Sequence, residues 1–376
     1  MDFDLTTEQR MIRDTVRDFA REVVLPGAAE RDETGEVPIA IMQQMGAMGL
    51  FGLPFPEQWG GSGGDTVSYA LAVEEISRVD ASLGLGFAAH VSLGCSPLHL
   101  FGSDAQKARY LTHAARGEYL AAFGLTEPEA GSDAGGTRTA AEAVPGGYRI
   151  SGTKIFITNA GHAGYIVATA RHQEAISSFI VPAGTPGLSV QCNYRKLGMR
   201  SSETCEVRFE GAEIPEDHLL GQAGHGFAQF LEILDGGRIS IAALGVGVAQ
   251  ACLDATIAYA RSRQQFGRTL DRFQAIQFKI ADMAMEVELA RNMVLKAAWL
   301  KDQHRPFSTE AAMAKLYASE AAMRASLQAV QVHGGAGYMR DFPVERYMRD
   351  AKLLEIGEGT SEIQRLVISR AVLGVR

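Results

Sequence analysis

Towards the end of the chain, one acidic residue lies between two glycines in a setting that suits proton transfer. Glu358 follows Gly357 and precedes Gly359, and Ser361-x-x-Gln364 fits a capping box that predicts a helix start. Because glycines leave the backbone bare, a flat substrate could approach the carboxylate closely. In an apolar pocket, burial can raise a carboxyl pKa towards neutrality and make the group a base. A solvated glutamate in a glycine loop explains the same residues without any chemistry.

Two further stretches carry groups that suit a flat heterocycle. Phe123–Asp133 is rich in hydroxyls, backbone amides and turn formers, and Gly131 permits close approach of a ring. Phe156 and Thr158 fall on one face of a predicted strand, which places an aromatic plate beside a hydroxyl. A turn between domains and a half-buried edge strand account for the same patterns, so the residues alone leave both interpretations open.

Composition and charge exclude several classes of protein. The 376 residues are 46% hydrophobic and 21% charged, which favours two or three globular domains with sizeable cores. The net charge of -8 gives no support to a nucleic-acid or anionic-membrane partner, and we expect neither. No apolar run approaches the roughly 18 residues that span a bilayer. Ile239–Ala249 is among the longest.

Cysteine spacing and the start of the chain bear on the compartment. Cys95, Cys192, Cys205 and Cys252 lie far apart without a C-x-x-C pair, which predicts structural thiols, no metal site and a reducing compartment. The acidic start at residues 1–4 leads into a capping box at Thr6-x-x-Gln9, unlike a targeting peptide. We therefore expect a cytoplasmic protein of bacterial type.

The period of the apolar residues changes twice along the chain. Residues 1–118 follow helical spacing, 119–225 break into short β-rich runs, and 226–376 return to helical spacing. The β runs leave no room for crossover helices, so the fold class is mostly α with a central antiparallel β barrel or sandwich. The predicted strands are Tyr148–Ile150, Lys154–Thr158, Tyr165–Ala170, Ser178–Val181, Leu188–Gln191 and Glu206–Phe209. The predicted helices of the last part are Gly226–Arg263, Phe273–Asp302, Ser308–Val332, Pro343–Leu354 and Thr360–Leu373.

Seven stretches together resemble the acyl-CoA dehydrogenase family, most closely its short-chain, butyryl-type members. They are Phe123–Asp133, Phe156–Thr158, Leu234–Arg238, Arg263–Gly267, Phe273–Gln277, Gln331–Gly335 and Glu358–Arg365, and they follow in register over essentially the whole chain. The resemblance implies a helical N-terminal domain, a middle β domain and a C-terminal four-helix bundle, with FAD between the β domain and the bundle. It also implies a homotetramer built as a pair of dimers, an acyl-CoA substrate and an electron-transfer flavoprotein as partner.

The resemblance further assigns residues to the cofactor and the substrate. The flavin ring would be held by Phe123, Leu125, Thr126, Gly131, Ser132, Phe156, Ile157 and Thr158. Phosphate, ribose and adenine would be held from the neighbouring subunit by Arg263, Phe266, Gln274, Gln331, Val332, Gly334 and Gly335, with Thr360 and Glu362 at a helix N-terminus. The acyl-CoA would contact Ser132, Asp235, Arg238 and Gly359.

The resemblance also implies the chemistry. Glu358 would take a proton from the α-carbon of the acyl thioester while hydride leaves the β-carbon for flavin N5, giving a trans-2-enoyl-CoA. The backbone N–H of the same residue and a ribityl hydroxyl would bond the thioester oxygen, where enolate charge develops. Some relatives take their base from a glutamate beside the arginine of the first bundle helix. Here that neighbour is Gly237, so Glu358 is the candidate in register.

Two departures from the family pattern bear on the substrate. Gly357 stands where an aromatic residue is frequent, which leaves chain length and branching open, and Phe156 stands where many members carry Trp. A glutaryl-type enzyme would want a buried cation on the pocket-lining helix, but residues 81–106 contain neither Lys nor Arg. His90 and His99 in that segment are expected to be packed or surface histidines.

Two other functions share this resemblance. An acyl-CoA oxidase would keep the fold and use O2 as the acceptor, although such enzymes are usually longer. A non-catalytic acyl-CoA-binding scaffold would have lost its redox function and would give a colourless protein.

Overall fold

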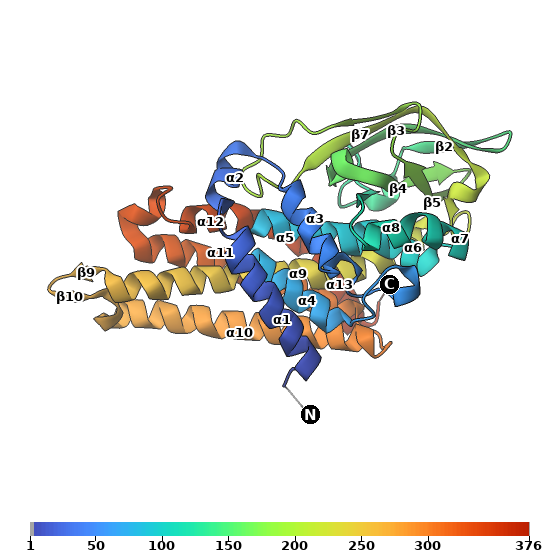
Figure 1. Ribbon diagram of the computed structural model, residues 1–376. Helices are drawn as coiled ribbons and strands as arrows, with labels where there is room; N and C mark the ends of the chain where they lie inside the picture. Colours follow the sequence, from blue (N-terminus) through green and yellow to red (C-terminus); the bar gives the residue numbers. More distant parts are fainter. Residues whose placement is uncertain (1–3, 376) are drawn as a thin grey trace.

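The computed structural model describes residues 4–375 and consists of helices, then a sheet, then helices again (Figure 1). Residues 1–3 of the acidic start lie outside the described residues. The first part contains α1 (Thr7–Phe19), α2 (Ala28–Thr34), α3 (Ile39–Ala47), α4 (Thr66–Ser77), α5 (Ala81–Ala89), α6 (Ser96–Phe101), α7 (Asp104–Gln106) and α8 (Thr112–Ala115). The predicted capping box is present, since Thr6 Oγ1 accepts from the Gln9 backbone N–H and the Gln9 side chain accepts from the Thr6 N–H.

A continuous sheet forms the second part and lies above the helices in Figure 1. It contains β1 (Leu120–Gly124), β2 (Ala140–Val144), β3 (Gly147–Thr158), β4 (Ala163–His172), β5 (Ala175–Pro182), β6 (Leu188–Gln191), β7 (Thr204–Pro215) and β8 (Leu219–Leu220), in the order β6-β7-β3-β2-β4-β5-β8 with β1 beside β4. Most pairs are antiparallel, as expected. The pairs β1–β4 and β2–β4 are parallel, which corrects the prediction of a wholly antiparallel sheet.

Long helices return in the third part and run side by side in Figure 1. They are α9 (Gly226–Ser262), α10 (Gln274–Asp302), α11 (Ser308–His333), α12 (Val344–Leu354) and α13 (Ser361–Leu373), close to the predicted bounds. A small hairpin, β9 (Gln264–Gln265) with β10 (Arg268–Thr269), links α9 to α10. Helix α9 lies at the centre, because it packs against α4, α10, α11 and α12.

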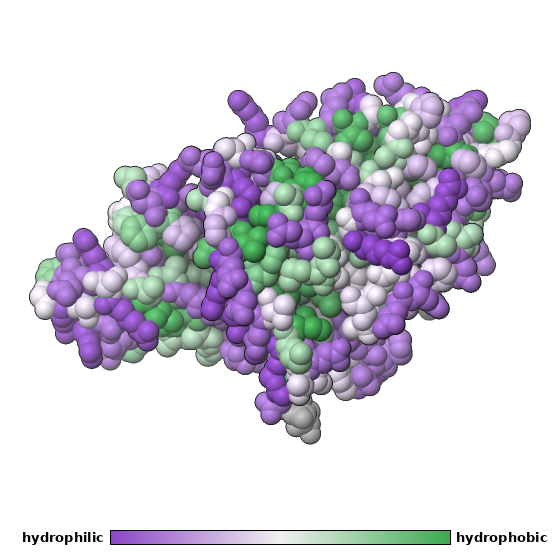
Figure 2. Space-filling view, viewed as in Figure 1, coloured by the Kyte–Doolittle hydropathy of each residue, from purple (hydrophilic) through white to green (hydrophobic). Residues whose placement is uncertain are grey.

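The helical parts at the two ends of the sequence share one core. Buried side chains of α4, α5, α9 and α11 belong to a single apolar cluster, and the sheet has a second cluster of its own. Two stretches, Ala81–Phe101 and Gly226–Ser262, are long and apolar enough to span a membrane. Within these stretches, 89% and 72% of the most apolar segment is buried inside the protein, as is typical of core helices. On the face seen in Figure 2, hydrophilic residues dominate and hydrophobic ones gather mainly near the middle.

The cysteine prediction is wrong for two of the four residues. Cys95 and Cys252 are free and buried, as structural thiols would be. Cys192 and Cys205 form a disulfide across 13 residues of sequence, because the chain turns back between β6 and β7. The spacing argument for a reducing compartment therefore fails. Among residues 4–375, the one group of possible metal ligands within 4.8 Å of one another contains these joined sulfurs and Glu203.

Candidate active site

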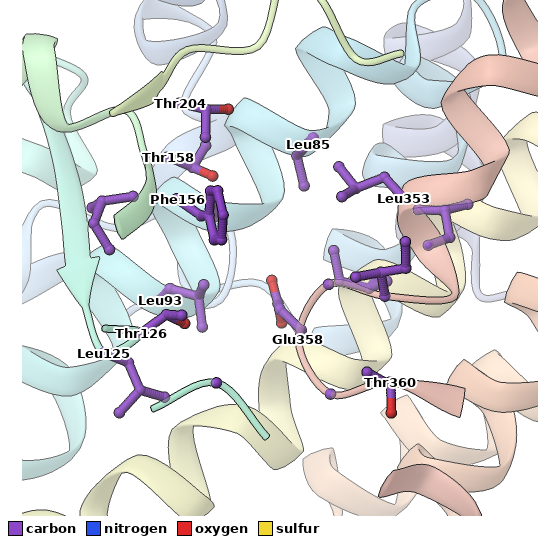
Figure 3. A pocket seen from close by; sticks show the side chains of 18 of the residues that line it. Leu85, Leu93, Leu125, Thr126, Phe156, Thr158, Thr204, Leu353, Glu358 and Thr360 are labelled. Atoms are coloured by element: carbon purple, nitrogen blue, oxygen red, sulfur yellow. The ribbon is translucent and has the colours of Figure 1, made fainter. Parts of the chain in front are cut away.

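Glu358 projects from the loop between α12 and α13 into a cavity of about 680 Å³ (Figure 3). Its backbone has φ 52°, a left-handed conformation that costs a non-glycine residue free energy and is found mostly at functional sites. Gly359 continues the turn with φ 95°. Gly237 of α9 leaves room for the carboxylate, since a Cβ added there would clash with Glu358 Oε2. The strained turn and the bare helix backbone together direct this side chain into the cavity.

The carboxylate of Glu358 is the most unusual group in the cavity. Its Oε2 atom is buried and has no hydrogen-bond partner among the described residues, although the residue keeps partial exposure towards the cavity. Burial raises the Glu358 pKa to about 7, while the positive charges of Lys315 and Arg238 oppose that rise. A buried acceptor left without a partner costs stability, so the site holds a group poised to take a proton.

Two side chains hold the backbone directly after Glu358 in place. The Gly359 carbonyl accepts from Lys315 Nζ at 2.6 Å and from Gln364 Nε2 at 3.0 Å. The predicted capping box at Ser361 is wrong, because Thr360 is the N-cap and its Oγ1 accepts from the Ile363 N–H. The Gln364 amide is used on the loop instead of the helix end.

On the sheet side, a buried ion pair holds the stretch Phe123–Asp133 in place. Lys154 Nζ of β3 lies 2.7 Å from Glu127 Oε1 and also donates to the Leu125 carbonyl at 3.0 Å. The Glu127 carboxylate accepts from the backbone N–H groups of Arg138 and Thr139. Burial lowers the Lys154 pKa to about 8. For Glu127 burial acts upward, but the lysine charge and the hydrogen bonds outweigh it and its pKa is lowered. This stretch, which lines the cavity, is therefore fixed to the sheet.

A bulge in β3 turns three consecutive residues towards the cavity. The pairing of β3 with β7 shifts register between Lys154 and Ile157, and Phe156 has φ 60°. Phe156, Ile157 and Thr158 all line the cavity as a result. Phe156 is 59% exposed, and the centroid of its ring lies 5.2 Å from that of the Tyr194 ring. An aromatic plate left open to a cavity suits a flat ring system stacked on it.

Helices form the opposite wall. Helix α5 continues through the π-helical segment η4 (His90–Cys95), and this run places Leu85, Ala89 and Leu93 on the cavity. His90 is fully buried: its Nδ1 accepts from the Ala121 N–H and its Nε2 bonds the Ala114 carbonyl. Burial lowers its pKa to about 4, so it is a neutral packed histidine, as predicted.

The structure brings together most of the residues assigned to the flavin ring and the acyl-CoA. Phe123, Leu125, Thr126, Gly131, Ser132, Phe156, Ile157, Thr158, Arg238, Glu358, Gly359 and Thr360 all line the cavity. Asp235 does not line it but forms an ion pair with Arg238. Burial lowers the Arg238 pKa, and Asp235 and Glu358 act against that.

The residues assigned to the distal part of the cofactor do not line this cavity. Arg263, Phe266 and Gln274 are exposed around the hairpin at the far end of α9. Gln331, Gly334 and Gly335 are exposed at the end of α11, Val332 is buried there, and Glu362 is exposed on α13. Their assignment to a neighbouring subunit remains a prediction.

Sequence reasoning missed several cavity residues. Tyr194, Arg195, Lys196 and Leu197 lie in the loop between β6 and β7, and Arg349, Lys352 and Leu353 lie on α12. No sequence pattern predicts that the loop between β6 and β7 lines the cavity. Lys315, which donates to the Gly359 carbonyl but is not among the cavity-lining residues, was also missed, although it is a single lysine among Ala311, Ala312, Ala314 and Ala318 on one helix.

The cavity fits an isoalloxazine ring. Its walls are largely apolar, the hydroxyl-bearing residues Thr126, Ser132 and Thr158 line it, and no atom of the described residues lies within 4 Å of a Cβ added at Gly131. Residues from the sheet and from the helical bundle meet there, with Phe156 and Glu358 on different sides (Figure 3). Such a site suits redox chemistry at carbon next to a base.

Comparison with known proteins agrees with a flavin site in this cavity. Family models for the acyl-CoA dehydrogenase N-terminal, middle and C-terminal domains match residues 6–118, 122–212 and 224–373. The chain is 57% identical over 379 residues to the probable acyl-CoA dehydrogenase YngJ of Bacillus subtilis, covering 99% of this chain and 100% of that protein.

Two solved structures are similar over nearly the whole length. Butyryl-CoA dehydrogenase from Megasphaera elsdenii shares 42% identity at TM-score 0.97, covering 99% of this chain and 100% of that one. A chain from work described as "Electron transferring flavoprotein of Acidaminococcus fermentans: Towards a mechanism of flavin-based electron bifurcation" shares 45% identity at TM-score 0.98, with 99% and 100% covered.

Fold and site thus define a flavin-dependent oxidoreductase. The chain belongs to the acyl-CoA dehydrogenase family, and its cofactor is FAD.

Proposed function

We propose that this enzyme dehydrogenates short or short branched acyl-CoA thioesters to trans-2-enoyl-CoA, with Glu358 as the base. The observation that carries the proposal is the buried, unpartnered Glu358 carboxylate, with its pKa raised to about 7, across an apolar cavity from Phe156. A base near neutral pKa is half ionised at working pH and accepts a proton with the least penalty.

In this proposal the chain's own residues hold the reactants and move one proton. Phe123–Ser132 and Phe156–Thr158 hold the flavin ring, and Thr360 marks a helix N-terminus facing the cofactor. Bound FAD supplies the acceptor for the hydride that leaves the substrate β-carbon. Glu358 Oε2 takes the α-proton, so one proton and one hydride leave as the α,β double bond forms. The apolar walls exclude water, which strengthens the electrostatic interactions of the substrate with Glu358 and with the bound flavin.

The thioester oxygen needs a donor where negative charge develops. Within the described part of the chain, the backbone N–H of Glu358 donates no hydrogen bond, whereas the preceding N–H of Gly357 donates to the Leu353 carbonyl. A free N–H on a fixed, left-handed turn costs no reorganisation when the enolate forms. We assign that N–H to the thioester oxygen, and Arg238 with Asp235 to the CoA arm.

Short chain length is supported by the walls of the cavity and by a relative. Leu85, Leu93 and Leu353 close the region around Glu358. The similar protein from Megasphaera elsdenii is a butyryl-CoA dehydrogenase. Gly357 leaves space beside the base, since the nearest atom to an added Cβ is 3.5 Å away, so branched chains belong in the substrate range.

The proposal includes two protein contacts. An electron-transfer flavoprotein takes the electrons, as the similarity to the Acidaminococcus fermentans structure suggests. A homotetramer brings the exposed residues around Arg263 and Gly334 to a neighbour's FAD. Phe266 is 93% exposed, and Phe278, Met285, Leu289 and Leu327 are exposed on α10 and α11, which supports a subunit interface there. Light scattering of the purified protein tests the assembly, and a monomer would reject it.

The function is tested by mixing the yellow protein anaerobically with saturated acyl-CoAs of two to eight carbons, straight and branched. We expect the flavin to bleach fastest with butyryl-CoA or a branched thioester of similar length, and trans-2-enoyl-CoA to form. No bleaching with any thioester would reject the proposal, and stoichiometric peroxide in air during turnover would indicate an oxidase instead.

A further inference from the structure

A lysine near the candidate base is buried and forms no side-chain ion pair within residues 4–375. Lys315 lies in the middle of α11 and is 0% exposed, although lysine is almost never fully buried unless it is paired. Its Nζ donates to the Gly359 carbonyl at 2.6 Å. Among the described residues, Glu358 is the acidic side chain that acts on Lys315 most strongly. Burying the Lys315 ammonium group costs desolvation free energy, so we expect this charge to serve a function.

The contact with Gly359 falls on the strained part of the loop. Glu358 and Gly359 both have positive φ, and a bond to the Gly359 carbonyl orients the peptide unit next to the base. Gln364 reaches the same carbonyl at 3.0 Å and the Glu358 carbonyl at 3.4 Å. Strained turns persist only where the surroundings fix them, and the ammonium group is the strongest donor on this one.

The same ammonium group faces the electrostatic field of the base. Glu358 is flanked by Lys315 from α11 and by Arg238 from α9, and Tyr69 from α4 is also coupled to it. The charges of Arg238, of Glu355 in the loop and of Glu362 on α13 also act on Lys315. Burial lowers the Lys315 pKa to about 8, so the group still carries its charge at neutral pH.

We propose that Lys315 is a positioning residue for the reaction: its buried ammonium group holds the Gly357–Gly359 turn and keeps the Glu358 carboxylate available as a base. The inference rests on the proposed role of Glu358. Without the Lys315 charge, Arg238 is the remaining nearby cation that opposes the effect of burial on Glu358. The Glu358 pKa therefore rises further, and the base keeps its proton to higher pH. Lys315 then controls the pH range of the enzyme without touching the substrate.

The test is the pH dependence of anaerobic flavin reduction by butyryl-CoA in the FAD-loaded protein. Lys315→Met should move the acidic limb of the rate profile upward by on the order of one pH unit. At pH 7, where half of the parent carboxylate is ionised, that shift lowers the rate about fivefold, and the rate recovers at higher pH. Lys315→Arg keeps charge and donor and should restore the limb. Lys301→Met is the matched control, because Lys301 is a largely buried lysine on α10 whose burial also lowers its pKa but which does not act on Glu358.

A second measurement does not depend on turnover. Glu358→Gln removes the titrating group, so its effect on unfolding free energy, measured against pH, reports the folded-state pKa of Glu358. We expect the pH at which this effect is half developed to be higher in the Lys315→Met background than in the parent. Should the Met variant fail to fold, Lys315→Gln takes its place in both measurements.

The outcomes separate the inference from the function on which it rests. Lys315 would be merely structural under two results together. Lys315→Met would lower the rate of flavin reduction equally at every pH without moving the acidic limb, and it would leave unchanged the pH at which the Glu358→Gln effect on unfolding free energy is half developed. Unchanged flavin reduction in Glu358→Gln would instead overturn the assignment of the base, and the unfolding midpoints would still report whether Lys315 tunes that carboxylate.

Discussion

Replacing Glu358 with glutamine should stabilise the protein, and the gain should grow with pH. The folded protein holds this carboxyl at a pKa of about 7, against an ordinary value of 4.5. Between these values the folded chain binds more protons than the unfolded chain, so the stability of the parent falls as pH rises. Below pH 4.5 both states are protonated and the group costs nothing. Above pH 7 the full cost is present, and the neutral amide escapes it at every pH.

The size of the effect follows from the pKa difference. Each pKa unit corresponds to about 1.4 kcal/mol, so the raised pKa amounts to about 3 kcal/mol above pH 7. Urea unfolding at pH 5, 6, 7 and 8, with a fixed excess of FAD and tryptophan fluorescence as the signal, measures the difference between parent and variant. It should rise from about 0.8 kcal/mol at pH 5 towards the full value at pH 8.

A matched variant guards against a general effect of removing an acid. Glu355 lies three residues earlier in the same segment, and its carboxylate pairs with Lys352 at 2.6 Å near the surface. Glu355→Gln should change stability by less than about 1 kcal/mol and should not gain stability with pH. If Glu358→Gln is neutral or destabilising at pH 8, the carboxylate is solvated and ionised, and the reasoning about its environment is refuted.

Three further predictions follow from single contacts. Gly237→Ala should abolish flavin reduction while the protein still folds and binds FAD, because the new methyl group occupies the space of the base; Gly236→Ala, whose methyl group meets only the flexible end of a lysine, is the control. Lys154→Met should lower the unfolding free energy by about 3–5 kcal/mol, since it leaves a buried carboxylate without its partner; retention of the parent's urea midpoint would contradict this. Reducing the Cys192–Cys205 disulfide with a dithiol should cost about 3 kcal/mol, and Cys205→Ala should make the urea midpoint insensitive to the dithiol.

The sequence predicts the helices of the last part well because each is long and carries a continuous apolar period. α9 is the clearest case: it is buried on nearly every side between Gly237 and Ala249, and the long apolar run there outweighs Gly245 and Gly247 within it. The strand within β7 was found because burial alternates along it, whereas β3 was found as two short β-rich runs although its burial does not alternate throughout. The short strands β1 and β2 were missed, because five residues without alternation look like a loop until β1 pairs with β4 and β2 pairs with β3.

Within the site, the sequence indicates residue types but not their geometry. Glu358 stood out by its two glycines, yet its left-handed backbone and its unpartnered Oε2 atom depend on contacts from α9 and α11. The capping-box prediction failed because tertiary contacts claimed the Gln364 amide for the Gly359 carbonyl. The disulfide was missed because Cys192 meets Cys205 only once β6 and β7 pair.

Proton exchange at the substrate α-carbon tests the central claim most directly. Butyryl-CoA is incubated in D2O with the parent enzyme, with Glu358→Gln and with Glu355→Gln, and deuterium at the α-carbon is measured by mass spectrometry. We expect the parent and Glu355→Gln to incorporate deuterium at similar rates, and Glu358→Gln to be slower by about 100-fold to 10,000-fold, the usual contribution of a positioned base. Undiminished incorporation by Glu358→Gln would show that another group removes the α-proton.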